Sequence, residues 1–160
     1  MDQQSYLSLC REASLLLELP DPDMLGTEGF LEYEGIGLAL YYDAEVVNDR
    51  LFCYVDGGQV SAEGRERILE RLLMLNLLSG SKTTGVYALD PSSGNILFCV
   101  HLMQPERLNP EILARHLRSN IERALNLREI LKQDIDDLDF VGAVKQIFQL
   151  EEIASPSELA

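Results

Sequence analysis

Residues 68–103 read Ile68-Leu-Glu-Arg-Leu-Leu-Met-Leu-Asn-Leu-Leu78, then, beyond a short loop, Gly85-Val-Tyr-Ala-Leu89, Asp90-Pro-Ser-Ser-Gly-Asn95 and Ile96-Leu-Phe-Cys-Val-His-Leu-Met103. The first part predicts a helix and the rest a β-hairpin, whose turn contains the turn-forming residues Pro91 and Gly94. From Leu72 to Leu78 only Asn76 is polar, so the helix is apolar on nearly every side. Such a helix is either buried centrally or shared with another subunit.

Two strands are predicted before this helix. Residues 36–42 alternate, with Ile36, Leu38, Leu40 and Tyr42 on one face and smaller or polar side chains on the other. A polar stretch then leads to a second strand at 51–55, which Gly57 and Gly58 are expected to end. Residues 29–33 allow one more short strand. Short strands joined by short polar loops predict an antiparallel sheet.

Helices are predicted on both sides of these strands. The first runs from about Gln4 to Leu19, where Pro20 stops it. The last begins at Asn109-Pro110-Glu111, which supplies a cap, a proline at the first helical position and an acid in the first turn. The fold class is therefore α+β, a twisted antiparallel sheet with helices packed on it. Residues 1–132 are expected to form the domain, and 133–160 an acidic appendage of a short helix and a frayed tail.

The charge of the chain excludes several classes of partner. Its 160 residues contain 13 Lys and Arg against 27 Asp and Glu, a formal net charge of −14 with a sequence pI of about 4.4. Nucleic acids and anionic membrane surfaces both require clustered cations, so neither is an expected partner. The chain also lacks an apolar run of the ~20 residues that a membrane span needs. The partner should be basic, neutral or mainly apolar.

The cysteines and the N-terminal residues indicate a reducing, cytoplasmic setting. Cys10, Cys53 and Cys99 cannot all pair within one chain, and they lie among apolar neighbours without metal-ligand spacing. Residues 1–20 carry an acid where a secretory signal needs basic residues. We therefore expect the three thiols to be small core residues of a cytoplasmic protein.

Every motif that suggests chemistry fails at a residue it requires. Ser79–Gly85 resembles a phosphate loop, but the spacing of its glycines and lysine is wrong and it follows a helix. Gly35–Leu40 has Leu40 where a dinucleotide fingerprint needs glycine or alanine. The aspartates of 134–139 do not match a calcium loop, and neither His101 nor His116 has partners at ligand spacing. No catalytic residue, cofactor or metal is predicted, although an enzyme site formed by residues distant in sequence stays a third alternative.

The remaining feature is a surplus of apolar side chains on a strongly acidic protein. The helix at 68–78 and the leucine-rich first helix supply most of it. One interpretation is a large core in a monomer. The other is a homodimer formed through the second helix, with apolar patches that hold another protein.

Three segments between residues 75 and 97 resemble those of a known family. Leu75-Asn-Leu-Leu-Ser-Gly80, Gly85-Val-Tyr-Ala-Leu-Asp-Pro91 and Gly94-Asn-Ile-Leu97 are similar to the leucine-rich helix, glycine loop, strand, turn and strand of the class I type III secretion chaperones, the Tir-chaperone (CesT-like) family. The small acidic chain and the order α-β-β-β-α-β-β-α agree with this resemblance. It covers about residues 3–132 and does not extend to the acidic appendage.

The resemblance implies a function and a set of partners. It implies a homodimer in the bacterial cytoplasm that binds the N-terminal chaperone-binding segment of secreted effectors, keeps it soluble and export-competent, and presents it to the secretion ATPase without hydrolysing ATP. A partly disordered segment would wrap the dimer and place its apolar anchors in surface grooves. The alternative is a regulatory adaptor of the same fold that binds a folded protein.

The resemblance also assigns residues to two surfaces. It implies a dimer contact through the helix at 68–78 and the strand at 86–89, with these residues at its centre: Leu72, Leu75, Leu78 and Val86. It implies effector patches on the first helix and the early strands, for which the candidates are Leu9, Leu16, Leu38, Leu40, Leu51 and Cys53. The sequence does not indicate which face of each strand is exposed.

Overall fold

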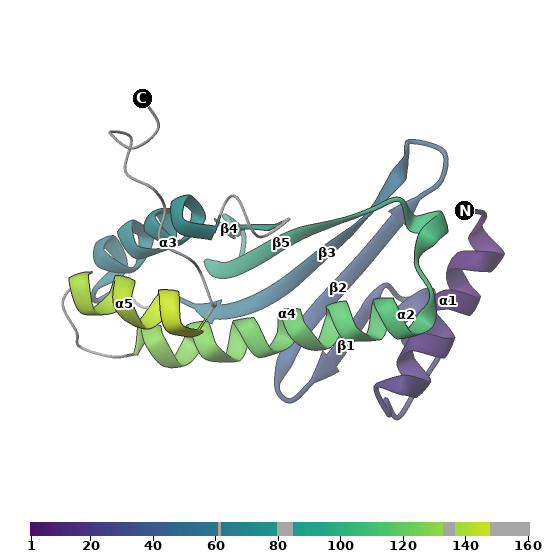
Figure 1. The fold of residues 1–160 in the computed structure, drawn as a ribbon, viewed down its shortest axis with the longest axis horizontal. Coiled ribbons are helices and arrows are strands. Elements are labelled where there is room, and N and C mark those ends of the chain that lie inside the picture. The colour runs from purple at the N-terminus through teal and green to yellow at the C-terminus, as the bar shows by residue number, and fades with distance from the viewer. Residues whose placement is uncertain (61, 80–84, 133–136, 148–160) are drawn as a thin grey trace.

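The structure is a computed structural model that describes residues 1–60, 62–79, 85–132 and 137–147 (Figure 1). Four parts of the chain lie outside the described residues: Ser61, the loop at 80–84, the start of the acidic segment at 133–136, and the predicted frayed tail. The elements follow in this order: α1 (Gln3–Leu16), α2 (Met24–Thr27), β1 (Phe30–Tyr33), β2 (Ile36–Asp43), β3 (Val47–Gln59), α3 (Arg65–Ser79), β4 (Gly85–Leu89), β5 (Asn95–Met103), the 3₁₀ turn η1 (Pro105–Arg107), α4 (Pro110–Leu131) and α5 (Asp137–Ile147).

The five strands form one antiparallel sheet in the order β1-β2-β3-β5-β4. This confirms the predicted α+β class, and β5 lies inside the sheet between β3 and β4. The helix α4 lies across one face of the sheet and α1 packs against α4 at one end (Figure 1). Among the described elements in Figure 1, no helix lies across the other face of the sheet.

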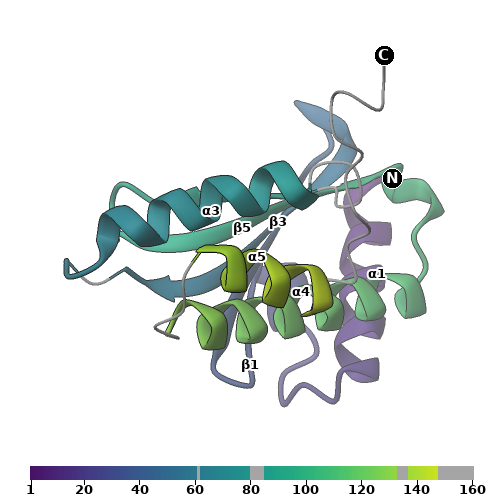
Figure 2. The same ribbon diagram turned by 60° about the vertical axis from the view of Figure 1, so that its left-hand side comes forward.

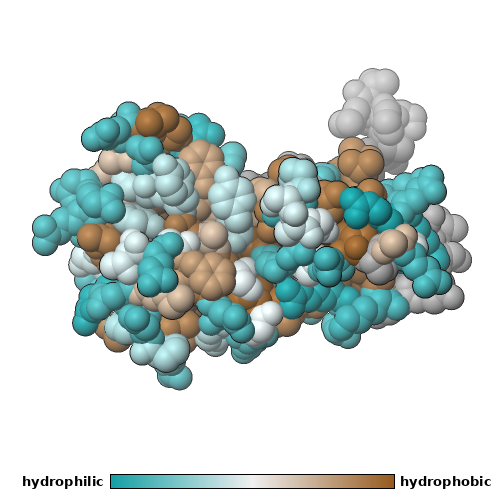
Figure 3. Space-filling model, turned by 180° about the vertical axis from the view of Figure 1, so that it is seen from behind, coloured by the Kyte–Doolittle hydropathy of each residue, from teal (hydrophilic) through white to brown (hydrophobic). Residues whose placement is uncertain are grey.

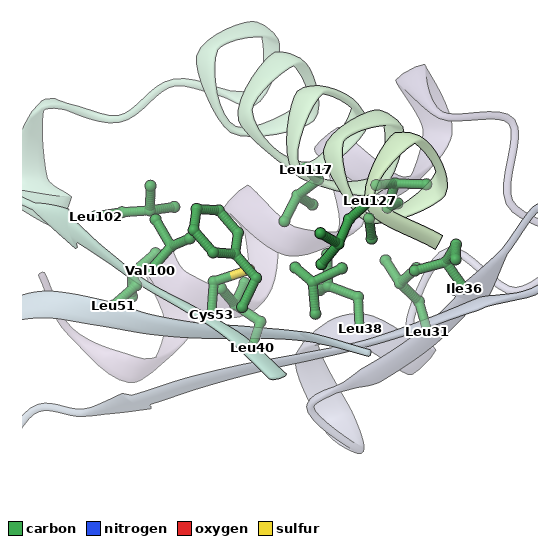
Figure 4. Close-up of a cluster of buried hydrophobic side chains, with 14 of the residues drawn as sticks. Leu31, Ile36, Leu38, Leu40, Leu51, Cys53, Val100, Leu102, Leu117 and Leu127 are labelled. Carbon is green, nitrogen blue, oxygen red and sulfur yellow. The ribbon is translucent and has the colours of Figure 1, made fainter. Parts of the chain in front are cut away.

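The core lies between the sheet and α4. Alternate side chains of β2, β3 and β5 point toward α4 and are buried, as the close-up in Figure 4 shows. The close-up labels ten residues of this core, of which Leu31 comes from β1, Leu117 and Leu127 from α4, and the others from those three strands: Ile36, Leu38, Leu40, Leu51, Cys53, Val100 and Leu102. The aliphatic side of each strand is therefore the core side, because burying branched apolar side chains stabilises the fold by roughly 1.5–3 kcal/mol each.

The helices α1 and α4 each begin at a side-chain cap. The carboxylate of Asp2 accepts a hydrogen bond from the Ser5 N–H (2.7 Å), and the amide oxygen of Asn109 accepts one from the Ile112 N–H (2.8 Å). The predicted start of α4 is thus confirmed. The helix α1 ends at Leu16, earlier than the predicted Leu19, because Glu18 turns the chain with a left-handed φ of 58°.

The strand β3 is longer than predicted. Gly57 and Gly58 were expected to end it, but pairing with β5 continues to Gln59 through a register shift between Asp56 and Gly58. Gly58 has a φ of +95°, and a Cβ atom there would lie 3.2 Å from the Nε of Arg128. Arg128 donates to the carbonyl oxygens of Gly35 (3.1 Å) and Asp56 (3.2 Å), so it ties the end of α4 to the turn between β1 and β2 and to β3.

The helix α3 lies beside the edge strand β4. The side chain of Asn76 accepts a hydrogen bond from the Tyr87 N–H (2.7 Å) and donates one to the Tyr87 carbonyl oxygen (3.0 Å). The strand β5 pairs with one edge of β4, and these two groups lie on the other edge, so the amide takes the place of a neighbouring strand. The single polar residue between Leu72 and Leu78 therefore covers a sheet edge.

We expect Asn76→Ala to lower the free energy of unfolding by about 1–3 kcal/mol, because the half-buried N–H and carbonyl of Tyr87 lose their partners. Urea denaturation at one fixed protein concentration measures this. The control is Asn126→Ala, which removes an exposed amide from another helix. Equal effects of the two substitutions would contradict the role of Asn76.

The helix α5 belongs to the same core. Phe140 and Val144 are fully buried, and the guanidinium of Arg71 lies 4.7 Å from the centroid of the Phe140 ring. Figure 2 shows α5 between α3 and α4, both of which it contacts. The part of the predicted appendage that the structure describes is thus a helix packed against the domain. Within the described residues no helix is long and apolar enough to cross a bilayer.

Candidate partner-binding surfaces

The sheet face turned away from α4 carries a row of apolar side chains. The register of the strands aligns one residue from each strand across its full width: Phe30, Ala39, Tyr54, Cys99 and Val86. Phe30, Tyr54 and Val86 are exposed, and Cys99 is half-buried. Figure 3 shows the molecule from this side, with apolar and aromatic side chains among hydrophilic ones. We call this surface, together with the second row described next, the open sheet face.

A second row on the same face is aromatic. Tyr41 lies beside Phe52 (ring centroids 6.4 Å apart), and the ring of Phe52 meets His101 edge to face at 4.9 Å. The hydroxyl of Tyr41 donates to Asp43 (3.0 Å). These rings give the open sheet face flat, rigid contact area, which is typical of surfaces that bind other proteins.

Acidic residues surround these two rows. Glu32, Asp43 and Asp56 lie at alternate positions of the strands that carry Phe30, Tyr41 and Tyr54. Hydrogen bonds from the backbone N–H groups of Val46 and Glu45, and then from Tyr41, lower the pKa of Asp43 and keep it ionised. Burial raises the pKa of the Cys99 thiol, which stays protonated at neutral pH. The open sheet face is therefore apolar in the middle, and Glu32 and Asp43 make part of its rim negative. Asp56 is paired with Arg128 (3.8 Å), and Arg50, on the same side of β3, is paired with Asp49 (2.7 Å).

A second exposed apolar surface lies on α3 and β4. Leu73 and Leu77, one helical turn apart, point to solvent, and Leu77 is 76% exposed. Val86 on β4 is 54% exposed. The hydrogen bonds between Asn76 and Tyr87 hold α3 against β4. Leu77 follows Asn76 and Val86 precedes Tyr87, so the backbones of Leu77 and Val86 lie near each other. We call Leu73, Leu77 and Val86 the α3 outer surface.

Within the described ranges, no three His, Cys, Asp or Glu side chains converge in a way that could hold a metal ion. Both surfaces instead offer contact area for another chain. Comparison with known proteins agrees with this arrangement.

The model of the Tir chaperone protein (CesT) family matches residues 41–128, more than half of the chain. The chain belongs to this family. The predicted family, a type III secretion chaperone family and not an enzyme family, is thereby confirmed. The matched region begins in β2 and ends near the C-terminus of α4, so it contains α3 and the hairpin of β4 and β5.

Two solved structures share the fold of this CesT-family chain. A chain from the crystal structure of the ExsC–ExsE complex superposes with a TM-score of 0.67 and 20% identity, covering 84% of this chain and 100% of that one. A chain of the HopA1–SchA chaperone–effector complex gives a TM-score of 0.57 and 20% identity, covering 81% and 98%. No curated protein sequence matches the chain.

The predicted effector-binding residues of this chaperone divide into two groups. Leu38, Leu40, Leu51 and Cys53 lie on the core side of the sheet beneath α4, where a partner cannot reach them while the protomer is folded (Figure 4). Leu9 is also buried, whereas Leu16 at the end of α1 is 46% exposed. The effector-binding proposal therefore moves to the alternate residues of the same strands.

The predicted dimer residues divide in a similar way. Leu72 and Leu75 face the interior of the protomer, and Leu75 is only 1% exposed. Leu78 is half-buried, and Val86 is exposed. Sequence reasoning missed Leu73 and Leu77, the two leucines of the same helix that do face solvent. The polar Asn76, bound to β4, was the signal that could have separated the inner side of the helix from the outer one.

Proposed function

We propose that two copies of this chain form a cytoplasmic homodimer that binds the N-terminal segment of a secreted effector on the open sheet face. The dimer keeps this segment extended and soluble, and presents it to the secretion ATPase. It catalyses no reaction. Membership of the CesT family supports the class of function, and the exposed apolar row of the open sheet face is the observation that carries the binding site.

The open sheet face suits an extended segment better than a compact one. Its apolar row crosses all five strands, so side chains along an extended segment can each meet a different strand. Such a segment is disordered when free and becomes ordered on binding, which allows it to cover a large area with modest affinity per unit area. The negative part of the rim favours basic residues in the segment and steers its approach.

The two edges of the sheet differ in a way that matters for binding. The edge of β4 is covered by the amide of Asn76. At the other end of the sheet order, β1 pairs on one side only, with β2. An extended segment that adds a strand to the sheet would therefore join at β1, next to Phe30 of the open sheet face.

The α3 outer surface is our proposed dimer contact. The predicted Leu72 and Leu75 lie inside the protomer, so the proposed contact uses Leu73 and Leu77 in their place. Val86 stays in the contact. A two-fold axis through this surface would bring each leucine against the same surface of the second copy. The contact lies at the β4 end of the sheet, where it includes Val86 of the open sheet face, and it leaves the rest of that face and β1 accessible.

We expect Tyr54→Asp to weaken effector binding by at least about thirtyfold, because a carboxylate replaces a central aromatic contact. Wild-type and variant chains are expressed in the native cell, and proteins that co-purify are identified by mass spectrometry. A secreted protein should be retained through its N-terminal region by the wild type and by Tyr54→Phe, but not by Tyr54→Asp. Thermal melting verifies that both variants are folded.

Two results would contradict the proposal. Retention of the same secreted protein by Tyr54→Asp would exclude the open sheet face as its site. Retention of a folded cytoplasmic protein, with no dependence on an N-terminal segment, would identify the chain as a regulatory adaptor.

A further inference from the structure

Three rings on the open sheet face form one continuous aromatic surface. Tyr41, Phe52 and His101 are aligned partners on β2, β3 and β5, and each ring contacts the next. We call these three residues the aromatic row. Tyr41 is 55% exposed, so more than half of it is open to a ligand. The faces of aromatic rings carry partial negative charge, which attracts cations.

A carboxylate is fixed beside the aromatic row. Asp43 follows Tyr41 on the same side of β2, and its Oδ2 atom accepts a hydrogen bond from the Tyr41 hydroxyl (3.0 Å). Its Oδ1 atom accepts hydrogen bonds from the backbone N–H groups of Val46 (3.0 Å) and Glu45 (2.9 Å). A carboxylate has about four acceptor sites, so the three bonds leave one available. The carboxylate is therefore held in place with room for one more donor.

The charges around Asp43 do not cancel. Residues 43–50 contain three acids, Asp43, Glu45 and Asp49, against the single cation Arg50, a net charge of −2. The side chain of Arg50 donates two hydrogen bonds to Asp49 (2.8 and 2.7 Å), so its charge is already paired. Within the part of the chain that the structure describes, Asp43 and Glu45 have no ion pair. The aromatic row thus lies beside uncompensated negative charge.

We propose that the aromatic row and Asp43 form a subsite for one arginine side chain of the client segment. The guanidinium lies over the rings of Tyr41 and Phe52 and donates to the available acceptor site of Asp43. Arginine fits this subsite better than lysine, because its planar group stacks on rings while its N–H groups donate in the same plane. This inference rests on the proposed function, because it requires a client segment on the open sheet face.

The position of the subsite explains why a long side chain is required. The aromatic row lies two residues along the strands from the apolar row that runs from Phe30 to Val86. Two residues of a strand span about 7 Å. A segment whose backbone follows the apolar row can therefore place an arginine on the aromatic row without leaving its path.

The first test uses a blocked peptide, acetyl-Ser-Gly-Arg-Gly-Ser-amide, titrated into the full-length ¹⁵N-labelled chain and followed by NMR. We expect chemical-shift changes at the backbone amides of Tyr41, Asp43 and Phe52. The same peptide with citrulline in place of arginine keeps the shape of the side chain without its charge, so it should bind about tenfold more weakly or worse. Equal affinities of the two peptides, or no shifts at these residues, would overturn the subsite.

A matched pair of variants isolates the carboxylate. Asp43→Asn should weaken binding of the arginine peptide about tenfold, whereas Asp90→Asn changes the net charge equally at the turn between β4 and β5 and should leave the affinity unchanged. Asp90 also holds its own turn, by accepting hydrogen bonds from the Ser92 N–H (2.9 Å) and the Ser93 hydroxyl (2.7 Å). The amide oxygen of asparagine can accept such bonds at both positions, so both variants should fold.

Tyr41→Leu should also weaken the arginine peptide, because the ring under the guanidinium is lost. Equal effects of the two asparagine variants would show unspecific attraction to an acidic chain. That result, or an unchanged affinity in Tyr41→Leu, contradicts the proposal.

The client distinguishes a failure of this subsite from a failure of the proposed function. The secreted protein retained by the wild type is titrated against both asparagine variants, and its dissociation constant should rise about tenfold for Asp43→Asn only. Equal binding to both variants would overturn the arginine subsite while leaving the effector site around Tyr54 intact. Retention of the client by Tyr54→Asp would instead overturn the proposed function.

Discussion

We expect Leu77→Asp to convert the proposed dimer into folded monomers. Leu77 is 76% exposed on the protomer and has no place in its core, so the substitution leaves the fold intact. In the proposed dimer it lies near the two-fold axis, where each copy would bury a carboxylate without a partner. Burying such a charge costs at least about 3 kcal/mol, which raises the dissociation constant of the dimer by roughly a hundredfold or more.

Sedimentation velocity across a concentration series measures this change, and circular dichroism verifies that the helices are retained. The control is Val46→Asp, because Val46 is 78% exposed, as much as Leu77, but lies in the loop between β2 and β3. The control should remain dimeric. If Leu77→Asp sediments as a dimer at the same concentrations as the wild type, the α3 outer surface is not the interface.

Leu75→Asp should have a different and larger consequence, the loss of the folded protomer. Leu75 lies two residues before Leu77 on the same helix but is 1% exposed and packed in the core. An unpaired carboxylate there costs several kcal/mol, a large share of the 5–15 kcal/mol that stabilises a typical domain. We expect the variant to be insoluble or to lack a cooperative thermal transition.

A conservative substitution provides the control for this second prediction. Leu75→Met keeps the side-chain volume, so it should lower the free energy of unfolding by less than about 1.5 kcal/mol and leave the dimer intact. Recovery of Leu75→Asp as a soluble, folded monomer would show instead that this side chain lies at the dimer contact and not in the core.

The two leucines illustrate what the sequence could and could not predict. The order of helices and strands, the antiparallel sheet and the start of α4 follow from local patterns, because caps, turns and alternation are properties of neighbouring residues. The apolar character of residues 72–78 was equally clear. Which leucine faces the core depends on where β4 and α5 lie, and among residues 72–78 only the polar Asn76 gives a sign of it.

For the strands, too, local pattern did not determine which side is buried, but the sequence contained a clue. Alternation separates Leu38 and Leu40 from Ala39 and Tyr41, but only the position of α4 determines which set is buried. The buried set is mostly aliphatic, although Tyr42, Tyr87 and Phe98 also belong to it, whereas the other set contains Tyr41, Tyr54 and the half-buried His101. The aliphatic majority of the buried set was a clue to the core side, because tyrosine and histidine tolerate contact with water.

Two further differences come from tertiary contacts. The glycines at 57 and 58 are typical of a strand end, yet pairing with β5 continues through them. A Cβ atom at 57 would lie 3.0 Å from the Ile96 side chain and one at 58 would lie 3.2 Å from Arg128, so these tertiary contacts favour glycine at both positions. The segment after 133 is acidic overall, yet Phe140 and Val144 give α5 one apolar side that packs between α3 and α4.

The sheet order also fixes how long a client segment must be. Because β1 and β4 are at opposite ends, and neighbouring strands lie about 4.8 Å apart, a segment crossing the sheet travels roughly 19 Å. An extended chain advances about 3.4 Å per residue, so one crossing takes about six residues. If the two protomers meet at their β4 ends, a segment that touches every strand of both needs about a dozen residues or more. Shorter segments can contact only one protomer, and one dimer could then hold two of them.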